Sequence, residues 1–322
     1  MRWKTFGIGL LLAGAGLTST AMAADWPQSS IQWVVPYPAG GGSDVIARLV
    51  AKQLETTLGQ SLVVENKPGA ATIIGATYVA NAKPDGYTVG TADSGTLAYN
   101  VSLYRSLQYD PSAFTYVGGL ARFPLMLAVP QGSPYKTLAD LLAAARAEPE
   151  KLTASSAGSG SPHHLALEMF EQLTDTKITH VPYKGAAPAI QDLLGGQVDM
   201  SFVDSAAALS NIKAGKLRVL GVATPARIDL LPDVPTMAEA GVKNFQAYAW
   251  QGMVGPKGMD AQANQRMSQV LMQALQDPAI AQRIRDMGVE PMPMTSEQFR
   301  SFAERERSEW AGVIQRAGIR LD

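Results

Sequence analysis

Two patterns of apolar and polar residues alternate along most of the chain. Residues 31–35 and 62–64 are short, mostly apolar runs rich in β-branched side chains, and such runs predict strands. A helix capped by Ser43 or Asp44 and ended by Gly59 is expected between them, because apolar residues recur there at helical spacing: Val45, Ile46, Leu49, Val50, Leu54 and Leu58. A helix over 72–82 and a strand over 87–92 complete a strand–helix–strand–helix–strand order. This order is typical of a parallel sheet with helices on both faces.

The same alternation returns in the second half of the chain. The expected strands are residues 125–129, 152–154, 178–181, 198–203 and 217–222, and the expected helices are 138–147, 162–173, 186–194 and 206–214. The segment from about 260 to 318 is predicted to be mainly helical. Its apolar stripe is expected in the core and consists of Phe299, Phe302, Trp310, Val313 and Ile314.

These two sets of elements predict two α/β domains, each with a mainly parallel sheet flanked by helices. No Gly/Ser-rich linker separates them, so short crossings and a hinged pair are expected. By fold analogy, the helical tail should pack back on the first domain, with the chain crossing the hinge near 122 and 249. The expected lobes are 24–122 with 250–322 for lobe 1, and 123–249 for lobe 2.

The first 23 residues have the features of a secretory signal peptide. Arg2 and Lys4 precede an apolar run over 6–17, which is too short to span a bilayer, and 21–23 (Ala-Met-Ala) is a small-x-small cleavage pattern. The alternative is an uncleaved anchor, which the short run and the cleavage pattern disfavour. We therefore expect a mature chain that begins at Ala24 and is free and soluble in the periplasm. With no Cys at the cleavage point, a lipoprotein is excluded.

Composition excludes several classes of function. The 322 residues contain no Cys and only three His, which leaves no thiolate chemistry and few ways to build a zinc site or a catalytic triad. The formal net charge of −1 argues against a nucleic-acid binder, which needs a clustered basic face. We expect no metal, no cofactor and no nucleic-acid partner.

The first candidate for ligand binding is the corner after the strand over 31–35. Three glycines precede a helix start, where free backbone N–H groups and the helix dipole favour an anion. No Gly-Lys-Ser/Thr follows, and the spacing of a dinucleotide-binding loop is absent, so a carboxylate fits better than a phosphate. A plain tight turn is the alternative. The candidate residues are Tyr37, Ala39, Gly40, Ser43 and Asp44.

The second candidate corner lies in the other domain, where Ser161 and Pro162 suit the cap and first turn of a helix. Its candidates are Ser156, Gly158, Ser161 and His164, and a flexible loop is the alternative. The G-x-S-x-G pattern of a hydrolase is absent. His163 and His164 are adjacent on a helix and point about 100° apart, which is no metal-ligand spacing. One is expected to face the site and the other to face solvent.

Three further corners follow predicted strands. One contains Tyr183, Lys184 and Gly185, one contains Asp204, and one contains Ser94 and Asn100. Asp204 either accepts from an ammonium group or caps the next helix. All five corners lie at the carboxyl ends of strands, where open α/β sheets bind ligands. Their hydroxyl, amide and backbone groups suit hydrogen bonding, and no pair of side chains looks like a catalytic acid and base.

At these residues the sequence resembles the Bug-type extracytoplasmic solute receptors, the binding component of tripartite tricarboxylate transporters. The matching stretches include VVPYPAGGGSDVIARLVA, SAGSGSPHHLA and HVPYKGAAPAIQDLLGGQVDMSF. The resemblance implies a two-lobed Venus-flytrap fold of the type II-like class that closes on a small carboxylate. It also implies that domain-edge loops and helix starts hold the carboxylate, often through bridging waters. Many relatives have Phe where this chain has Tyr37, and Gly42 is an additional glycine.

The function implied is a periplasmic solute-binding protein and not an enzyme. It would capture a di- or tricarboxylate, an acidic amino acid or an aromatic acid by hinge closure, and deliver it to membrane permease subunits of a tripartite tricarboxylate-type transporter. The alternative is a receptor that presents its closed form to a membrane sensor kinase. We expect a monomer.

Overall fold

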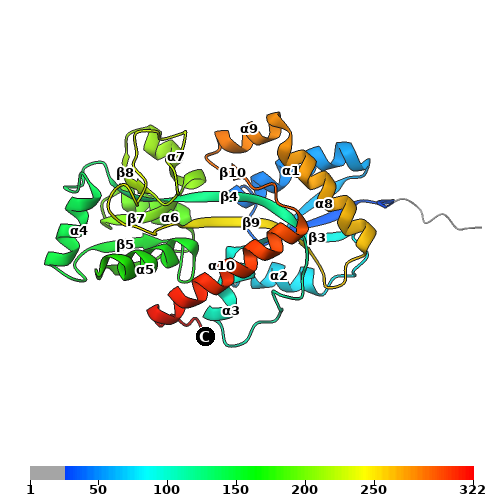
Figure 1. The fold of residues 1–322 in the computed structure, drawn as a ribbon, viewed down its shortest axis with the longest axis horizontal. Helices are drawn as coiled ribbons and strands as arrows, with labels where there is room; N and C mark the ends of the chain where they lie inside the picture. The colour runs from blue at the N-terminus through cyan, green and yellow to red at the C-terminus, as the bar shows by residue number, and fades with distance from the viewer. Residues whose placement is uncertain (1–25) are drawn as a thin grey trace, which may run out of the picture.

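A computed structural model describes residues 26–322, so the predicted signal peptide lies outside the described residues. Two α/β lobes lie side by side and are joined by long strands (Figure 1). Lobe 1 contains three parallel strands, β1 (Ile31–Val35), β2 (Leu62–Asn66) and β3 (Thr88–Asp93). Its other elements are α1 (Gly42–Leu58), α2 (Ile73–Ala80), the π-helical turn η1 (Gly95–Tyr99), α3 (Asn100–Leu103), α8 (Ala261–Gln276), α9 (Pro278–Asp286) and β10 (Glu290–Pro291).

Lobe 2 repeats the arrangement with a second parallel set, in which β5 pairs with both β6 and β7. The strands are β5 (Thr153–Ser156), β6 (Thr179–Pro182), β7 (Met200–Asp204) and β8 (Leu217–Val222). The helices are α4 (Leu138–Ala147), α5 (Pro162–Thr174), α6 (Ala186–Leu194) and α7 (Ser205–Lys213). Because β5, β6 and β7 are parallel, their carboxyl ends meet at one edge of the sheet.

Two long strands connect the lobes. β4 (Thr115–Pro130) pairs with β9 (Tyr248–Gly255) through Pro124, and from Leu125 onward it pairs with β7 and β8. β9 also pairs with β3, and all these pairings are antiparallel. The strand order β2-β1-β3-β9-β4-β7-β5-β6 therefore runs without a break from one lobe to the other. The sequence pattern did not predict β9, nor the part of β4 before Leu125.

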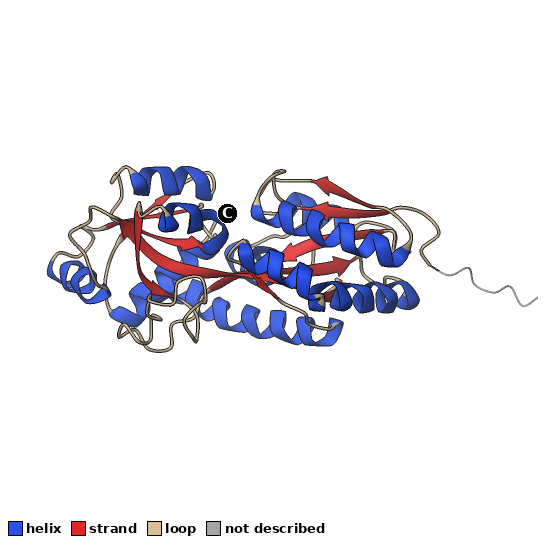
Figure 2. Ribbon diagram, turned by 90° about the horizontal axis from the view of Figure 1, so that it is seen from above, coloured by secondary structure: helices blue, strands red, loops and turns tan. Residues whose placement is uncertain are grey.

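Burial follows the amphipathic patterns, with small shifts. In α1 the buried residues are Ile46, Ala47, Val50, Ala51 and Leu54, whereas Val45 is exposed. α10 (Ser296–Ala317) buries Phe299, Trp310, Val313 and Ile314, as predicted, and Phe302 packs against the same core. This helix packs on β4 and η1, and its carboxyl-terminal half reaches α5 of lobe 2, where Gln172 Nε2 donates to Val313 O at 3.1 Å. Figure 2 shows helices on both sides of the strands of each lobe. None of the helices within residues 26–322 combines the length and apolar character needed to cross a membrane.

Candidate ligand-binding site

The β1–α1 corner is an open helix start with a carboxylate inside it. α1 begins at Gly42 with Gly41 as N-cap, so the prediction that Ser43 or Asp44 caps the helix is wrong. Ala39 and Gly40 are exposed, and Val45 donates the first helical hydrogen bond, to Gly41 O at 3.0 Å. The N–H groups of Gly42 and Ser43 precede that bond and point away from the helix body. The corner therefore offers backbone donors at the positive end of a 17-residue helix.

Asp44 lies in the first turn of α1 and is buried by its own partners. Its carboxylate accepts from Gly40 N at 2.9 Å and from Asn66 Nδ2 at 2.9 Å, and it pairs with Arg48 at 3.0 Å. Burial alone would raise the pKa of Asp44, but these donors outweigh it and hold the pKa below its usual range. Ser43 Oγ donates to Gln251 Oε1 on β9 at 2.6 Å. These two side chains fasten the corner within lobe 1.

The β3–η1 corner is organised around a second buried carboxylate, that of Asp93. Asp93 accepts from the Thr96 N–H at 2.8 Å and the Thr96 hydroxyl at 2.7 Å, and Tyr37 Oη donates to its other oxygen. Burial and the neighbouring Asp93 raise the pKa of Tyr37 well above its usual value. Ser94 is buried beside Asp93. The Tyr37 hydroxyl is therefore committed to a partner within lobe 1.

Asn100 holds a left-handed stretch of backbone. Its Nδ2 donates to Ala71 O at 3.0 Å and lies 3.2 Å from Tyr109 Oη. Ala70, Ala71 and Thr72 all have positive φ, between 45° and 74°, which is costly for residues with a Cβ. Both donor contacts of the amide are made inside lobe 1, and Asn100 is 2% exposed. The structure therefore assigns its side chain to supporting this turn.

The β5–α5 corner joins hydroxyls, imidazoles and backbone amides. Ser156 Oγ lies 2.7 Å from His180 Nε2 and also exchanges hydrogen bonds with the Gly158 N–H and C=O at 3.1 Å. Ser161 is the N-cap of α5, where its Oγ accepts from His164 N at 3.3 Å. The ring of His180 stacks on the ring of His164, and within residues 26–322 its hydrogen-bond partner is Ser156 and no carboxylate. Ser156 and His180 consequently lack the orienting acid that nucleophilic catalysis needs.

The prediction that one of His163 and His164 faces solvent is wrong, because both are buried. His163 is 8% exposed and His164 is 6% exposed. His163 Nε2 lies 3.3 Å from Asp204 Oδ2, and His164 Nδ1 accepts from Gly160 N at 3.0 Å. Both adjacent positions are buried because His163 packs against Asp204 at the end of β7 and His164 stacks on His180 of β6.

Asp204 performs the capping role that the sequence left open. It is the N-cap of α7 and accepts from Ala207 N at 2.8 Å. Burial alone would raise the pKa of Asp204, but the His163 imidazole and the Ala207 N–H outweigh it and keep the pKa below its usual range. One carboxylate oxygen of Asp204 thus accepts from the start of α7, and the other lies against His163.

The β6–α6 corner supplies the most accessible cation of the predicted set. Tyr183 Oη donates to Asp192 at 2.6 Å, which occupies its hydroxyl and raises its pKa. Lys184 is exposed, and Gly185, with φ of +112°, is the N-cap of α6. Gly185 N donates to Ala157 O at 3.2 Å, which ties this corner to the β5–α5 corner.

Three contacts between the lobes lie beside these corners. A Cβ added at Gly42 would lie 3.8 Å from the Cβ of Ala206 in lobe 2, and one added at Gly160 would lie 2.7 Å from Leu103 of lobe 1. Ser205 Oγ donates to Gly288 O. The structure thus brings the start of α1 beside the start of α7, and the β5–α5 corner beside α3.

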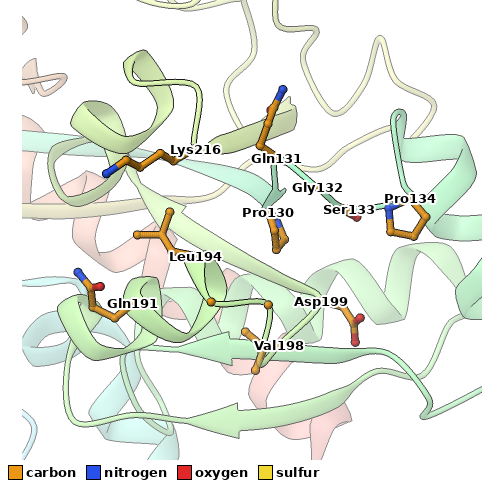
Figure 3. A pocket seen from close by; sticks show the side chains of 12 residues that line it. Pro130, Gln131, Gly132, Ser133, Pro134, Gln191, Leu194, Val198, Asp199 and Lys216 are labelled. Carbon is orange, nitrogen blue, oxygen red and sulfur yellow. The ribbon is translucent and has the colours of Figure 1, made fainter.

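A groove on lobe 2 lies away from these corners. The end of β4 at Pro130 and the segment between α6 and β7 form its walls (Figure 3). Its lining residues include Gln131, Ser133, Asp199 and Lys216. None of the predicted site residues lines it. Within the described residues, no group of three or more His, Asp or Glu side chains is placed to hold a metal ion.

Several residues outside the predicted set organise the corners. Asp93, His180 and Gln251 each hydrogen-bond to a predicted site residue, and Thr96 donates to Asp93. Asp93 and Thr96 belong to the same corner as the predicted Ser94, and His180 directly precedes the corner of Tyr183 and Lys184. The pairing of Gln251 with Ser43 depends on β9, whose position beside β3 no local pattern indicated.

The arrangement of lobes and crossing strands is that of two-lobed periplasmic binding proteins. The chain belongs to the tripartite tricarboxylate transporter family of receptors, whose family model matches residues 46–319. This is a family of substrate-binding receptors, not of enzymes.

Individual relatives cover nearly the whole chain. The protein BugT of Bordetella pertussis is 35% identical over 319 residues, which is 98% of this chain and 97% of BugT. Rpa4515 of R. palustris, solved with adipate, is 35% identical with a TM-score of 0.86, covering 92% of this chain and all of that one. MatC of Rhodopseudomonas palustris, solved with bound malate, is 31% identical with a TM-score of 0.80, covering 90% of this chain and all of MatC.

Proposed function

We propose that this protein captures a small carboxylate between its two lobes in the periplasm and delivers it to permease subunits of a tripartite tricarboxylate-type transporter. The observation that carries the proposal is the meeting of helix starts from opposite lobes, at Gly42 of α1 and Ala206 of α7. Helix N-termini attract anions through unpaired N–H groups and the helix dipole. An anion between the lobes would contact both, and it would therefore favour their approach.

The chemical class of ligand is a small carboxylate. The relatives Rpa4515 and MatC were solved with adipate and malate, both dicarboxylates. A dicarboxylate has one charged group for each lobe, whereas the corners offer few cations beyond Lys184. Tricarboxylates, acidic amino acids and aromatic acids remain members of the proposed class. Bridging waters would carry contacts that side chains already committed to partners cannot make directly.

The residues of the proposed site come from both lobes. Lobe 1 would contribute Tyr37, Ala39, Gly40, Ser43, Asp44, Ser94 and Asn100. Lobe 2 would contribute Ser156, Gly158, Ser161, His164, Tyr183, Lys184, Gly185 and Asp204. Among them, the backbone groups near Gly40 and Gly158 and the Lys184 ammonium would face the ligand. The others, such as Asn100 and Asp204, would hold the corners in shape.

Ligand capture would use a hinge at the crossing strands. β4 changes its partner from β9 to β7 and β8 between Pro124 and Leu125, and β9 begins at Tyr248. We place the lobe boundaries near 122 and 249 for this reason. A ligand that contacts both lobes shifts the population toward the closed form by its differential affinity. The protein would act as a monomer after removal of residues 1–23.

A substitution at the contact between lobes tests capture. Gly42→Leu places a side chain against Ala206 and Phe123 without left-handed backbone strain, so it should hold the lobes apart. We expect calorimetry to give adipate or malate affinity at least tenfold weaker than wild type. Gly132→Leu is the matched control, because a Cβ at Gly132 meets nothing within 4 Å. Equal affinity in Gly42→Leu and wild type would refute capture between the lobes.

Delivery is tested in the cell of origin. Deletion of the gene should abolish uptake of the carboxylate that the purified protein binds, and restoring the gene should recover uptake. Normal uptake combined with loss of a transcriptional response to the same carboxylate would instead support a sensing role.

A further inference from the structure

Two of the three histidines form a stacked pair beside the β5–α5 corner. The rings of His164 on α5 and His180 on β6 are nearly parallel, with centroids 3.8 Å apart and planes 10° apart. His180 Nε2 contacts Ser156 Oγ at 2.7 Å, and His164 Nδ1 accepts from Gly160 N at 3.0 Å. The pair therefore touches the corner both where β5 ends and just before α5 begins.

The hydrogen bonds around the pair assign the ring of His164 as neutral and place a proton on Nε2 of His180. A ring nitrogen that accepts a hydrogen bond carries no proton, so the proton of His164 is on Nε2, which faces Glu168 Oε1 at 3.2 Å. Ser156 Oγ donates to Gly158 O, so it accepts from His180 Nε2. Any further proton on His164 must bind at Nδ1, where it would face the Gly160 N–H. That arrangement replaces a hydrogen bond with two opposed donors.

The surroundings of His180 favour its neutral state at neutral pH. Burial and the neighbouring His164 lower the pKa of His180 to about 4, and Glu168 opposes this effect. The groups that face the pair are Glu168 and Glu171 of α5 and Ser156 of β5. Because this lowered pKa lies below that of an unfolded histidine, neutral His180 stabilises the fold above about pH 6.5, and that stabilisation is lost as the pH falls toward 4.

Gly160 connects the histidine pair to the contact between the lobes. Its φ of +75° suits glycine, and a Cβ there would lie 2.7 Å from Leu103 and 2.8 Å from Leu321. Leu321 N in turn donates to Leu103 O at 3.0 Å, so these two leucines belong to one unit of lobe 1. A displacement of Gly160 must therefore change how lobe 2 packs against lobe 1.

We propose that His164 and His180 are a positioning pair that holds the β5–α5 corner, and through Gly160 the contact between the lobes, only while both rings are neutral. Acidification then breaks the bond from Gly160 N to His164 and releases the corner. The same corner is part of the proposed carboxylate site, so acidification should also weaken capture of the ligand. This last step rests on the proposed function.

The first experiment needs no ligand. Nuclear magnetic resonance of the full chain, titrated from pH 7 to pH 4, follows the Gly160 amide and the rings of the three histidines. We expect the protection of the Gly160 amide against hydrogen exchange to fall by about tenfold. The midpoint of this fall in pH should coincide with the titration midpoint of one ring of the stacked pair. A Gly160 amide that does not respond while the stacked rings titrate would overturn the proposal.

Substitutions separate positioning from a merely structural role. His164→Asn brings an amide oxygen to the position of Nδ1, so it can accept from Gly160 N without titrating, and we expect no acid transition at Gly160. The same transition in His164→Asn as in wild type would overturn the proposal. His163→Asn assigns the ring signals and should leave the transition in place. If His164→Asn does not fold, His180→Gln should move the midpoint to higher pH, and an unchanged midpoint counts against the proposal.

The second experiment measures capture with adipate and malate by calorimetry at pH 7 and pH 5. The carboxyl groups of these ligands also titrate, so the comparison is between wild type and His164→Asn at each pH. We expect wild-type affinity to fall about fivefold more than that of the variant. If the affinities of wild type and His164→Asn fall by the same factor, the histidine pair does not control capture. Absence of binding by either ligand at both pH values would count against the proposed function, while the resonance titration still decides the role of the histidine pair.

Discussion

The corners of the two lobes are built from different chemistry. In lobe 1, the side chains beside the helix start include two carboxylates, Asp44 and Asp93, whose oxygens are bonded to groups of the same lobe. In lobe 2, the corresponding positions hold Ser156, the stacked histidines and the exposed Lys184. Its carboxylates are also paired within the lobe: Asp204 is bonded to His163 and the start of α7, and Asp192 accepts from Tyr183. Charge that complements a carboxylate is thus concentrated in lobe 2.

This difference shows how an anion site can be built beside acidic residues. Each carboxylate of lobe 1 is held by several donors, so it organises the backbone instead of competing for the same N–H groups as a ligand. Lobe 1 then offers backbone donors such as those of Gly42 and Ser43. Substitutions of the lobe 1 carboxylates should therefore lower the stability of the protein. Substitutions of the lobe 2 side chains should instead lower its affinity for the ligand.

The largest effect is expected from Asp93→Ala in lobe 1. This change leaves the Tyr37 hydroxyl and both Thr96 donors without their buried acceptor, and we expect the free energy of unfolding to fall by about 3 kcal/mol. Urea unfolding followed by circular dichroism measures it. Asp85→Ala is the control, since Asp85 accepts a single hydrogen bond, from Tyr87 N, at an exposed site. Equal losses for the two variants would mean that the Asp93 cluster does not stabilise lobe 1.

Much of this architecture was readable from local patterns. The apolar spacing in α1 and α10 predicted both helices and most of their buried faces, because a period near 3.6 residues depends on the local chain alone. The cap at Ser161 followed from residue type in the same way. The two sets of elements predicted two hinged α/β domains, and the family resemblance added that they form a Venus-flytrap fold that closes on a ligand.

Features that depend on distant pairings were not predictable. β9 joins β3 to β4 across more than a hundred residues of sequence, and its Gln251 side chain completes the β1–α1 corner. The helix start at Gly42 was misplaced because Ser43 and Asp44 are good caps by type. Their side chains instead bond to Gln251 and to Arg48 with Asn66. The burial of both His163 and His164 likewise depends on other elements, through Asp204 at the end of β7 and His180 on β6.

A smaller effect is expected from Lys184→Gln in lobe 2, and it concerns affinity. Removing the exposed ammonium should weaken binding of malate or adipate about tenfold, near 1.4 kcal/mol, and should leave the free energy of unfolding unchanged. Calorimetry and urea unfolding measure the two quantities. Lys213→Gln, an exposed lysine on α7 of the same lobe, is the matched control. If both variants bind as wild type does, Lys184 does not contact the ligand, and the assignment of complementary charge to lobe 2 weakens.

The smallest effect is expected from Asp44→Asn, and it depends on pH. Arg48, Gly40 and Asn66 hold the pKa of Asp44 below its usual range despite its burial, so the ionised carboxylate stabilises the folded state. That stabilisation is fully present above the unfolded pKa near 4, and it is lost as the pH falls through the lower folded value. We expect Asp44→Asn to be about 1 kcal/mol less stable than wild type at pH 7, with the difference vanishing toward pH 2. Urea unfolding across this range measures it. A difference that stays constant with pH would show that shape, and not charge, fixes the first turn of α1. The contrast between a lobe 1 whose carboxylates organise its backbone and a lobe 2 that carries the exposed Lys184 would then not rest on charge at this corner.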